Sequence, residues 1–190
     1  MQMARVLTYS KHQKSMLAAW PRSIIERSVF ECSKTVMNIR PAKPSDIPRL
    51  VELWIEFMDH HVQYDSAYAR SGDAVDNWVK YIESKFSDDN CRIFVAETGG
   101  QVVGYVGAVV KEYPPVFEVL KYGFIEEIAV TREFRHRGVG KGLAGAAEEW
   151  LRSTGVTRFD VKIDVANEAS MALFQGRRFK ARSQTLTRKA

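Results

Sequence analysis

The most constraining feature of this sequence is a glycine-rich turn that joins a short apolar run to an amphipathic segment. Residues 124–130 are mostly apolar and predict a strand, while residues 139–153 repeat apolar side chains at helical spacing. Gly138 and Gly140 lie between them and carry no Cβ atom to hold a ligand away from the backbone. Such a unit directs free backbone N–H groups and the positive end of a helix dipole at one point. It therefore predicts a pyrophosphate cradle, to which three basic residues add charge: Arg135, Arg137 and Lys141.

The spacing of the glycines excludes two common nucleotide-binding patterns. The Walker pattern, GxxxxGK[ST], is absent from the chain. The dinucleotide pattern GxGxxG occurs at residues 140–145, but most of it lies inside the predicted helix, whereas that fold needs its first glycine in the strand–helix turn. The spacing that fits the turn is Arg-x-x-Gly-x-Gly at residues 135–140. On the turn alone, a purely structural need for glycine is the alternative to phosphate binding.

The periodicity of the rest of the chain predicts a mixed α/β domain built around one sheet. Thr98-Gly99-Gly100 is typical of a hairpin turn between two strands. The predicted strands cover residues 35–40, 92–97, 101–111, 124–130, 158–165 and 179–186, and the predicted helices cover residues 47–61, 73–86, 139–153 and 167–175.

At the glycine-rich turn the chain resembles the GNAT superfamily of N-acetyltransferases. The hallmark of that family, [Q/R]-x-x-G-x-[G/A] between a strand and a helix, matches residues 135–140. A second signature, N-x-x-A/S-x-x-L-Y, is similar to the segment from Asn167 to Phe174. The resemblance covers residues 38–186 and implies a central, mixed, mostly antiparallel sheet of six to seven strands flanked by about four helices. It divides the chain into an acetyltransferase domain, residues 38–190, and a preceding segment, residues 1–37.

The resemblance implies acetyl-CoA as co-substrate and no metal, and it assigns the coenzyme to named positions. Backbone groups of the strand would pair with the pantetheine arm, and amides of the turn would bind the pyrophosphate. Asn167 would contact the pantetheine or the thioester, with Ser170 nearby. The backbone positions implied in this way are Ile128, Ala129, Val130, Arg135, His136, Arg137, Gly138, Val139, Gly140 and Lys141.

Two adjacent carboxylates, Glu126 and Glu127, are the candidates for the base that deprotonates the amine. In a regular strand they point to opposite faces, so only one can face the acceptor pocket. A local likeness of residues 125–130 to diamine acetyltransferases favours Glu126, and Glu127 contributes where the strand is distorted. The alternative is that both are exposed acids at a strand edge.

Two positions depart from the family pattern. Phe174 stands where the family often has a tyrosine that is proposed as the general acid, and phenylalanine cannot donate a proton. A water or a tyrosine from residues 112–122 could replace it, or the thiolate could leave unassisted, because its pKa is only about 8–9. Arg178 stands where the family commonly has glycine.

The segment around His60 and His61 carries polar residues at the end of a predicted helix. Without a matching ligand set, adjacent histidines are more often polar surface than a metal site. By family likeness this helix end borders the acceptor pocket, so four residues are low-ranked candidates for substrate binding: His60, His61, Tyr64 and Asp65. Residues 113–117 are either a lid over that pocket or an irregular connection.

The charge of the chain is concentrated at its beginning. Residues 1–37 contain six basic and two acidic residues, a net charge of +4 out of the total of +5. They are interpreted as a poorly ordered basic extension, with a targeting peptide and the product of a wrong start codon as the alternatives. The rest of the chain is nearly neutral and lacks a basic stripe with interleaved aromatics, so nucleic acid is not an expected partner. No apolar run is long enough for a membrane span, and two cysteines are too few for a disulfide scaffold, so we expect a cytoplasmic protein.

Two function classes stay open at this point. The first is an acetyl-CoA-dependent N-acetyltransferase that acts on a small-molecule amine or on a protein amino group. The second is a non-catalytic acyl-CoA-binding regulatory module that kept the cradle and lost its acid at position 174. A homodimer is an expectation from the family alone.

Overall fold

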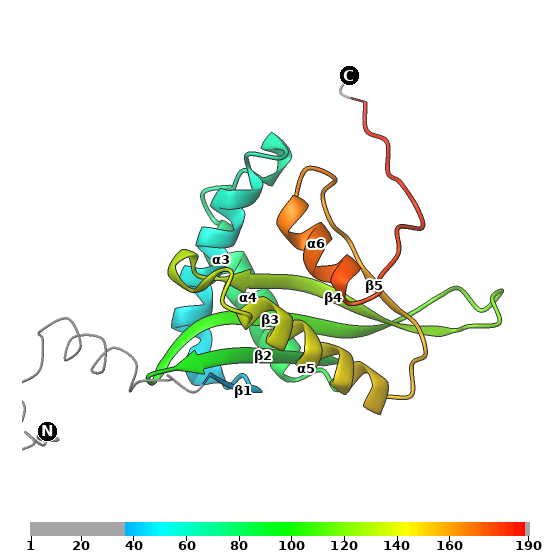
Figure 1. Cartoon of the computed structure of the whole chain (residues 1–190), viewed down its shortest axis with the longest axis horizontal. Coiled ribbons are helices and arrows are strands. Elements are labelled where there is room, and N and C mark those ends of the chain that lie inside the picture. Colours follow the sequence, from blue (N-terminus) through cyan, green and yellow to red (C-terminus); the bar gives the residue numbers. More distant parts are fainter. Residues whose placement is uncertain (1–36, 189–190) are drawn as a thin grey trace, which may run out of the picture. The chain divides into compact units, whose positions relative to one another are not determined.

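A computed structural model describes residues 37–188 of the chain. These residues form one sheet with helices packed on both of its faces (Figure 1). The expected basic extension, residues 1–37, lies outside the described residues except for Met37.

The sheet has five strands in the order β1-β2-β3-β4-β5. The first four pair antiparallel, and β5 pairs parallel to β4. The strands are β1 (Asn38–Pro41), β2 (Cys91–Thr98), β3 (Gln101–Glu112), β4 (Lys121–Val130) and β5 (Phe159–Val161). The predicted class of fold is confirmed, and so is the turn at Gly99 and Gly100, which have φ angles of 58° and 79°.

Two strand predictions were wrong. The strand expected at residues 158–165 is only three residues long, and residues 179–188 contain no strand. The described chain therefore has five strands where the resemblance implied six to seven. The alternating pattern gives a segment a preference for extended backbone, but a strand also needs a neighbour to complete its hydrogen bonds. Residues 180–188 are exposed and pair with no described strand.

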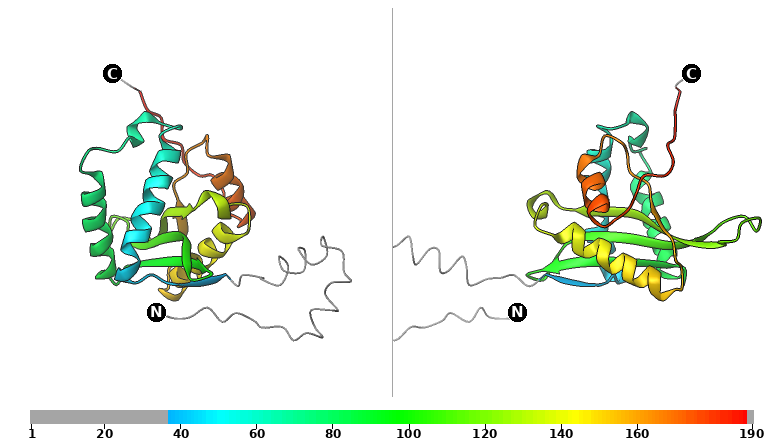
Figure 2. Two further views of the ribbon diagram at one scale, coloured as in Figure 1. Left: turned by 90° about the vertical axis from the view of Figure 1, so that its left-hand side faces the viewer. Right: turned by 45° about the vertical axis from the view of Figure 1, so that its right-hand side comes forward.

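The four predicted helices are all present. They are α3 (Ile47–His61), α4 (Ala74–Phe86), α5 (Val139–Ser153) and α6 (Glu168–Gly176), with short 3-10 turns η1 (Pro44–Asp46), η2 (Ser66–Tyr68) and η3 (Arg132–Phe134). Helices α3 and α4 cover one face of the sheet, and α5 covers the other (Figure 2).

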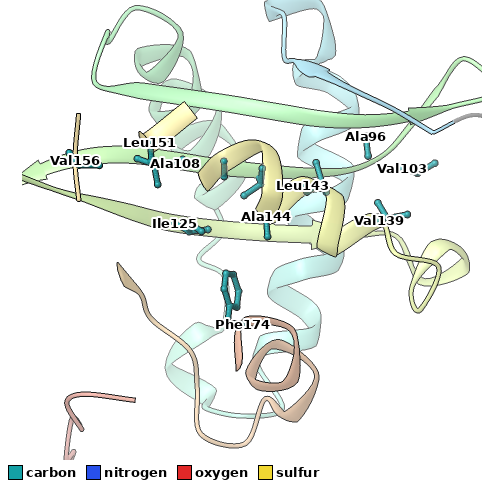
Figure 3. Packing of buried hydrophobic residues seen from close by; sticks show 12 residues of the cluster. Ala96, Val103, Ala108, Ile125, Val139, Leu143, Ala144, Leu151, Val156 and Phe174 are labelled. Carbon is teal, nitrogen blue, oxygen red and sulfur yellow. The ribbon is translucent and has the colours of Figure 1, made fainter. Parts of the chain in front are cut away.

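Each face of the sheet has its own hydrophobic core. On the side of α3 and α4, Leu50, Leu53 and Trp78 pack with Tyr105 of β3. On the side of α5, Leu143 and Leu151 pack against β3 and β4 together with Phe174 of α6, whose ring points toward the strand that carries Ile125 (Figure 3). Both faces of the sheet are thus covered, and β5 pairs only with residues 123–125 of β4.

The α5 core also explains the GxGxxG match. A Cβ atom at Gly142 would lie 2.6 Å from Ile39 Cδ1, so this glycine lets α5 approach β1 closely. Residues 140–145, which carry the GxGxxG match, lie within α5 as predicted, so the first glycine of that pattern is not in the strand–helix turn.

The connection between β3 and β4 extends past the edge of the helices (Figure 1). At its base Tyr113 stacks on Tyr122 at 4.2 Å, and its hydroxyl donates to Asp160 of β5 at 3.3 Å. At its tip Val116 and Phe117 are exposed. Among residues 37–188, no helix is long and apolar enough to cross a membrane.

Candidate active site

Strand β4 carries both predicted carboxylates, and an irregularity in the strand turns them to the same side. Gly107 of β3 pairs with Glu127 and Ala108 pairs with Ile125, so Glu126 is one extra residue in β4. A bulge of this kind breaks the alternation of side chains. Glu126 and Glu127 consequently both face α4 and line one small cavity, with a volume of about 10 Å³. The expectation that they point to opposite faces was therefore wrong.

Glu127 lies in the drier environment of the two. The hydroxyl of the fully buried Tyr105 donates to Glu127 Oε2 at 2.7 Å. Burial raises the pKa of the Glu127 carboxyl, and the hydrogen bond from Tyr105 offsets only part of that effect. The indole N–H of Trp78 is buried without an acceptor among the described residues, and its proximity also acts to lower the pKa of Glu127. A carboxylate of raised pKa beside a cavity is suited to accept a proton near neutral pH.

Glu126, in contrast, is surrounded by positive charge. Lys85 Nζ lies 3.1 Å from Glu126 Oε2, and Lys111 Nζ lies 3.7 Å from Oε1. The Tyr81 hydroxyl donates to Oε2 at 3.0 Å. Burial acts to lower the pKa of Lys85, but the contacts with Tyr81 and Glu126 outweigh it and raise that pKa. The geometry thus favours Glu127 over Glu126 as a base, the reverse of the ranking from the sequence.

The cavity also contains a thiol that is unsuited to covalent catalysis. Burial raises the pKa of Cys91 to about 11, with a further contribution from its hydrogen bond to Asp88. The nucleophilic form of cysteine is the thiolate, so Cys91 stays protonated and inert at neutral pH.

Beyond Glu127, β4 has an open edge. Strand β5 pairs only with residues 123–125 of β4 and then diverges. Thr131 N donates to Val103 O, so alternation directs the amides of Glu127 and Ala129 toward β3. The amides of Ile128 and Val130 point the other way, to the edge where β5 has ended. Of the three predicted positions, Ile128 and Val130 can therefore pair with an extended ligand, and Ala129 cannot.

The open edge leads to the predicted cradle. His136 and Gly138 have φ angles of 59° and 84°, a left-handed backbone that is unusual for histidine. The first hydrogen bond of α5 runs from Gly142 N to Gly138 O, so the preceding amides of Val139, Gly140 and Lys141 have no acceptor within the helix. No side chain caps this end of α5. These amides and the exposed loop form an anion-binding concavity at a helix N-terminus.

The space in front of the cradle is open. A Cβ atom added at Gly138 would meet no other atom within 4 Å, and one at Gly140 would meet Leu173 Cδ2 at an ordinary 3.6 Å. Packing within the chain therefore requires glycine at neither position. The left-handed backbone requires it at Gly138, and a ligand close to the backbone would require it at Gly140. The cradle fits a pyrophosphate.

Arg135 is bound within the protein rather than directed at the cradle. Its Nε donates to Val130 O at 2.9 Å, and its Nη2 donates to Glu56 of α3 at 2.8 Å. Glu56 also accepts from the amide of Arg132 at 2.9 Å. Glu56 was not predicted from the sequence, because a single acid on a helix gives no signal of a partner 79 residues away. Arg137 and Lys141 are exposed beside the cradle, and the Arg137 guanidinium lies over the Phe134 ring.

Helix α6 forms the wall opposite the open edge. Asn167 is buried, and its side-chain oxygen accepts the amide of Ser170 at 3.0 Å as the N-cap of the helix. Phe174 is 1% exposed and packs against Phe179, with ring centroids 5.2 Å apart. Position 174 is thus part of the core.

The C-terminal end of α3 carries the four low-ranked candidates. His60 Nε2 lies 3.0 Å from the Tyr64 hydroxyl, and His61 Nδ1 lies 2.8 Å from Phe57 O. Burial lowers the pKa of His60, and the nearby charge of Arg135 lowers it further. Asp65 accepts the amide of Ala67 at 3.0 Å. Three of these side chains thus form an aromatic cluster next to Arg135, and Asp65 serves as a local cap. Within residues 37–188 no group of three His, Cys, Asp or Glu side chains could hold a metal ion.

Comparisons with known proteins found sequences similar to this chain. The sequence profile described as acetyltransferase (GNAT) family matches residues 49–179. An uncharacterised N-acetyltransferase of Archaeoglobus fulgidus is 34% identical over 114 residues, which cover 60% of this chain and 73% of the relative. L-2,4-diaminobutyric acid acetyltransferase of Nocardia farcinica is 31% identical over 159 residues, which cover 75% of this chain and 78% of that protein.

The fold is also similar to solved structures. The aminoglycoside N-acetyltransferase AAC(6')-Iy, solved in complex with CoA, superimposes with a TM-score of 0.64 at 21% identity. The match covers 82% of this chain and 95% of that one.

Proposed function

This chain belongs to the GNAT acetyltransferase family and is an acyltransferase, and we propose that it transfers the acetyl group of acetyl-CoA to a primary amine with Glu127 as the general base. The observation that carries the proposal is the course of β4. One strand links the half-buried carboxylate of Glu127, the unpaired amides of Ile128 and Val130, and the cradle at the start of α5. A coenzyme with an extended amide-bearing arm and a pyrophosphate matches this order.

The cradle, the open edge of β4 and Glu127 each have one task in the proposed reaction. The amides of the cradle hold the pyrophosphate, and the open edge of β4 aligns the arm. Bound acetyl-CoA supplies an acetyl group activated as a thioester. Glu127 takes a proton from the attacking amine, whose nitrogen forms the new C–N bond while the C–S bond breaks.

No side chain at position 174 can protonate the departing sulfur, because Phe174 is apolar and buried. Tyr113 and Tyr122, candidates from the connection between β3 and β4, stack on each other beside Asp160 of β5. We therefore propose that the thiolate leaves unassisted and takes its proton from solvent, which its pKa of about 8–9 allows.

The acceptor is a small-molecule amine in this proposal. The relatives that carry a substrate in their names act on small amines, diaminobutyric acid and aminoglycosides. A protein amino group is the alternative, and a panel of small amines and lysine peptides separates the two by thiol release from acetyl-CoA.

The cradle is tested by Gly138→Asp. A carboxylate there meets the pyrophosphate, so the affinity for CoA should fall at least about 100-fold, which is about 2.7 kcal/mol. Gly100→Asp is the matched control, because Gly100 has a similar φ of 79° and equally open surroundings. Calorimetry with CoA measures both variants. Unchanged affinity of Gly138→Asp would refute the cradle.

The base is tested by Glu127→Gln. General-base catalysis contributes about 10²–10⁴-fold, so kcat should fall by that factor while CoA affinity is retained. If the wild-type protein binds acetyl-CoA but releases no thiol with any amine, the regulatory module replaces the enzyme.

A further inference from the structure

Glu126 is a second carboxylate that the proposed reaction does not use, and it lies between two lysines. Lys85 comes from α4 and Lys111 from β3, and both approach Glu126 within 4 Å. Glu127, one residue further along the bulged strand, lines the same cavity as Lys85 and Glu126. The proposed base therefore lies near two positively charged side chains, Lys85 and Lys111, which we call the lysine pair.

Glu126 does not use all the hydrogen-bond donors of the lysine pair. Among residues 37–188 it is the one carboxylate within 4 Å of both lysines, while the charge of Lys85 also acts on Glu127 and Asp88. Lys85 is the tighter partner, with a side chain that is 15% exposed, and the Tyr81 hydroxyl bonds the same carboxylate oxygen.

Lys111 is the looser partner. Its Nζ is 3.7 Å from Glu126, beyond hydrogen-bond distance, and its side chain is 38% exposed. The ammonium is held in place over the Phe124 ring, 3.9 Å from the centroid. An ammonium has three donors, so Lys111 can bind an incoming anion without first breaking a hydrogen bond to Glu126.

We propose that the acceptor is an amine that also carries a carboxylate, of the amino-acid class, and that the lysine pair binds this carboxylate while Glu127 faces the amine. This inference rests on the proposed acetyltransferase function and adds the substrate class. An amino acid carries both a carboxylate and an amine. These two groups can face Lys111 and Glu127, which lie on the same side of the sheet.

Lys111 favours an amino acid over the matching diamine. A diamine brings an ammonium where the amino acid brings a carboxylate, and an ammonium close to Lys111 is unfavourable.

The reaction is balanced with this acceptor. The reacting amine loses one proton to Glu127, its nitrogen bonds the acetyl carbon, and the sulfur leaves as thiolate. The carboxylate of the acceptor takes no part in bond making and stays with the lysine pair, so it affects binding and orientation alone.

Three matched pairs of acceptors test the substrate class, each pair differing by one carboxylate. They are 2,4-diaminobutyrate with 1,3-diaminopropane, ornithine with putrescine, and lysine with cadaverine. Thiol release from acetyl-CoA gives kcat/KM for each compound. We expect the carboxylated member of at least one pair to be preferred by about tenfold or more, since a hydrogen bond to a charged group contributes roughly 1.5–3 kcal/mol.

Variants of the lysine pair assign the preference to its source. Lys111→Ala and Lys111→Glu should lower kcat/KM for the carboxylated acceptor and reduce or reverse the ratio within the pair. Lys80→Ala is the control, because Lys80 is an exposed lysine of α4 that forms no ion pair with Glu126. Calorimetry of the carboxylated acceptor with the protein saturated with CoA provides a second readout, in which Lys111→Ala should weaken binding and Lys80→Ala should not.

Two results would overturn the inference while leaving the proposed function intact. One is the absence of a preference for the carboxylated member in any of the three pairs, and the other is a preference for the amino acid that Lys111→Ala and Lys111→Glu leave unchanged. Acetylation of lysine peptides in place of every free amino acid would overturn both the inference and the proposal of a small-molecule acceptor. Binding of acetyl-CoA without thiol release from any amine would instead refute the proposed function itself.

Discussion

Glu126 and Glu127 show how neighbouring residues of one chemical type acquire different properties. Glu127 loses solvent and gains the hydroxyl of Tyr105, so its pKa is raised by burial. Glu126 keeps its charge balanced by lysines. The difference comes from the surroundings, and the proposal of Glu127 as the general base rests on it.

The raised pKa of Glu127 predicts a pH dependence. The base must be ionised to act, so kcat/KM should rise with pH through the pKa of Glu127, at a higher pH than for an ordinary glutamate. Tyr105→Phe removes a donor that stabilises the carboxylate, and the rising limb should move to still higher pH. The pH profile of kcat/KM measures this shift.

Tyr113→Phe is the control for that experiment, because it removes a tyrosine hydroxyl bound to Asp160. Its profile should match the wild type.

Glu127→Gln adds a stability readout. Since burial raises the pKa, folded Glu127 binds its proton more tightly than the unfolded chain, and stability falls as pH rises through that interval. The variant should therefore gain melting temperature relative to wild type at pH 8, and less at pH 4. If Tyr105→Phe and Tyr113→Phe give the same pH profile of kcat/KM, the group that titrates in this profile is not Glu127.

At the scale of the element, the end of α6 explains the departure at Arg178. The amide of Phe179 donates to Phe174 O and that of Arg178 to Gln175 O, the two bonds of a Schellman motif. Arg178 occupies the left-handed position of the motif, with a φ of 69°. Glycine, which the family commonly has at this position, takes the conformation without strain. Arg178 therefore imposes a conformational cost on the backbone at the end of α6.

Arg178→Gly should stabilise the protein. A non-glycine residue in this conformation costs about 1–2 kcal/mol, and glycine returns roughly 0.5–1 kcal/mol through its freedom in the unfolded chain. We expect a net gain of about 0.5–1 kcal/mol in the free energy of unfolding, measured by denaturant titration. Arg182→Gly lies in the exposed segment without regular structure and should give no gain. A loss of stability in Arg178→Gly would contradict the strain.

The helices could be predicted from the sequence because each has a continuous apolar face. The ranges of α3 and α5 agree with the predicted residues 47–61 and 139–153. The bulge at Glu126 could not be predicted, since it depends on the register between β3 and β4. The strand at residues 179–186 failed because periodicity describes one segment and pairing requires two. Lys85, Lys111 and Glu56 were missed for the same reason, as each acts through a contact distant in sequence.

On the scale of the whole molecule, both cores are built from described residues. The cluster on the α5 side and the cluster on the side of α3 and α4 draw on residues between Ile39 and Phe179. Together they pack against all five strands, and the candidate active site lies where β4 continues beyond its pairing with β5.

Removal of residues 1–36 should therefore leave the domain intact. We expect the melting temperature to change by less than about 2 °C and the affinity for CoA to stay the same, because residues between Ile39 and Phe179 build both described cores and the cradle lies at the start of α5. The deletion removes most of the net positive charge, so any salt-sensitive binding to DNA should disappear with it. A deletion variant that does not fold would show that the segment belongs to the domain.

The open edge of β4 gives the protein an exchange pattern that can be read without any assay of activity. The amide protons of Ile128 and Val130 face the edge and should exchange quickly with deuterium, while those of Glu127 and Ala129, bonded to β3, should exchange slowly. A ligand that pairs along the edge would slow the first two and leave the others unchanged. Amide exchange at alternate residues of β4 would thus report whether the coenzyme pairs with this strand as a sixth strand would.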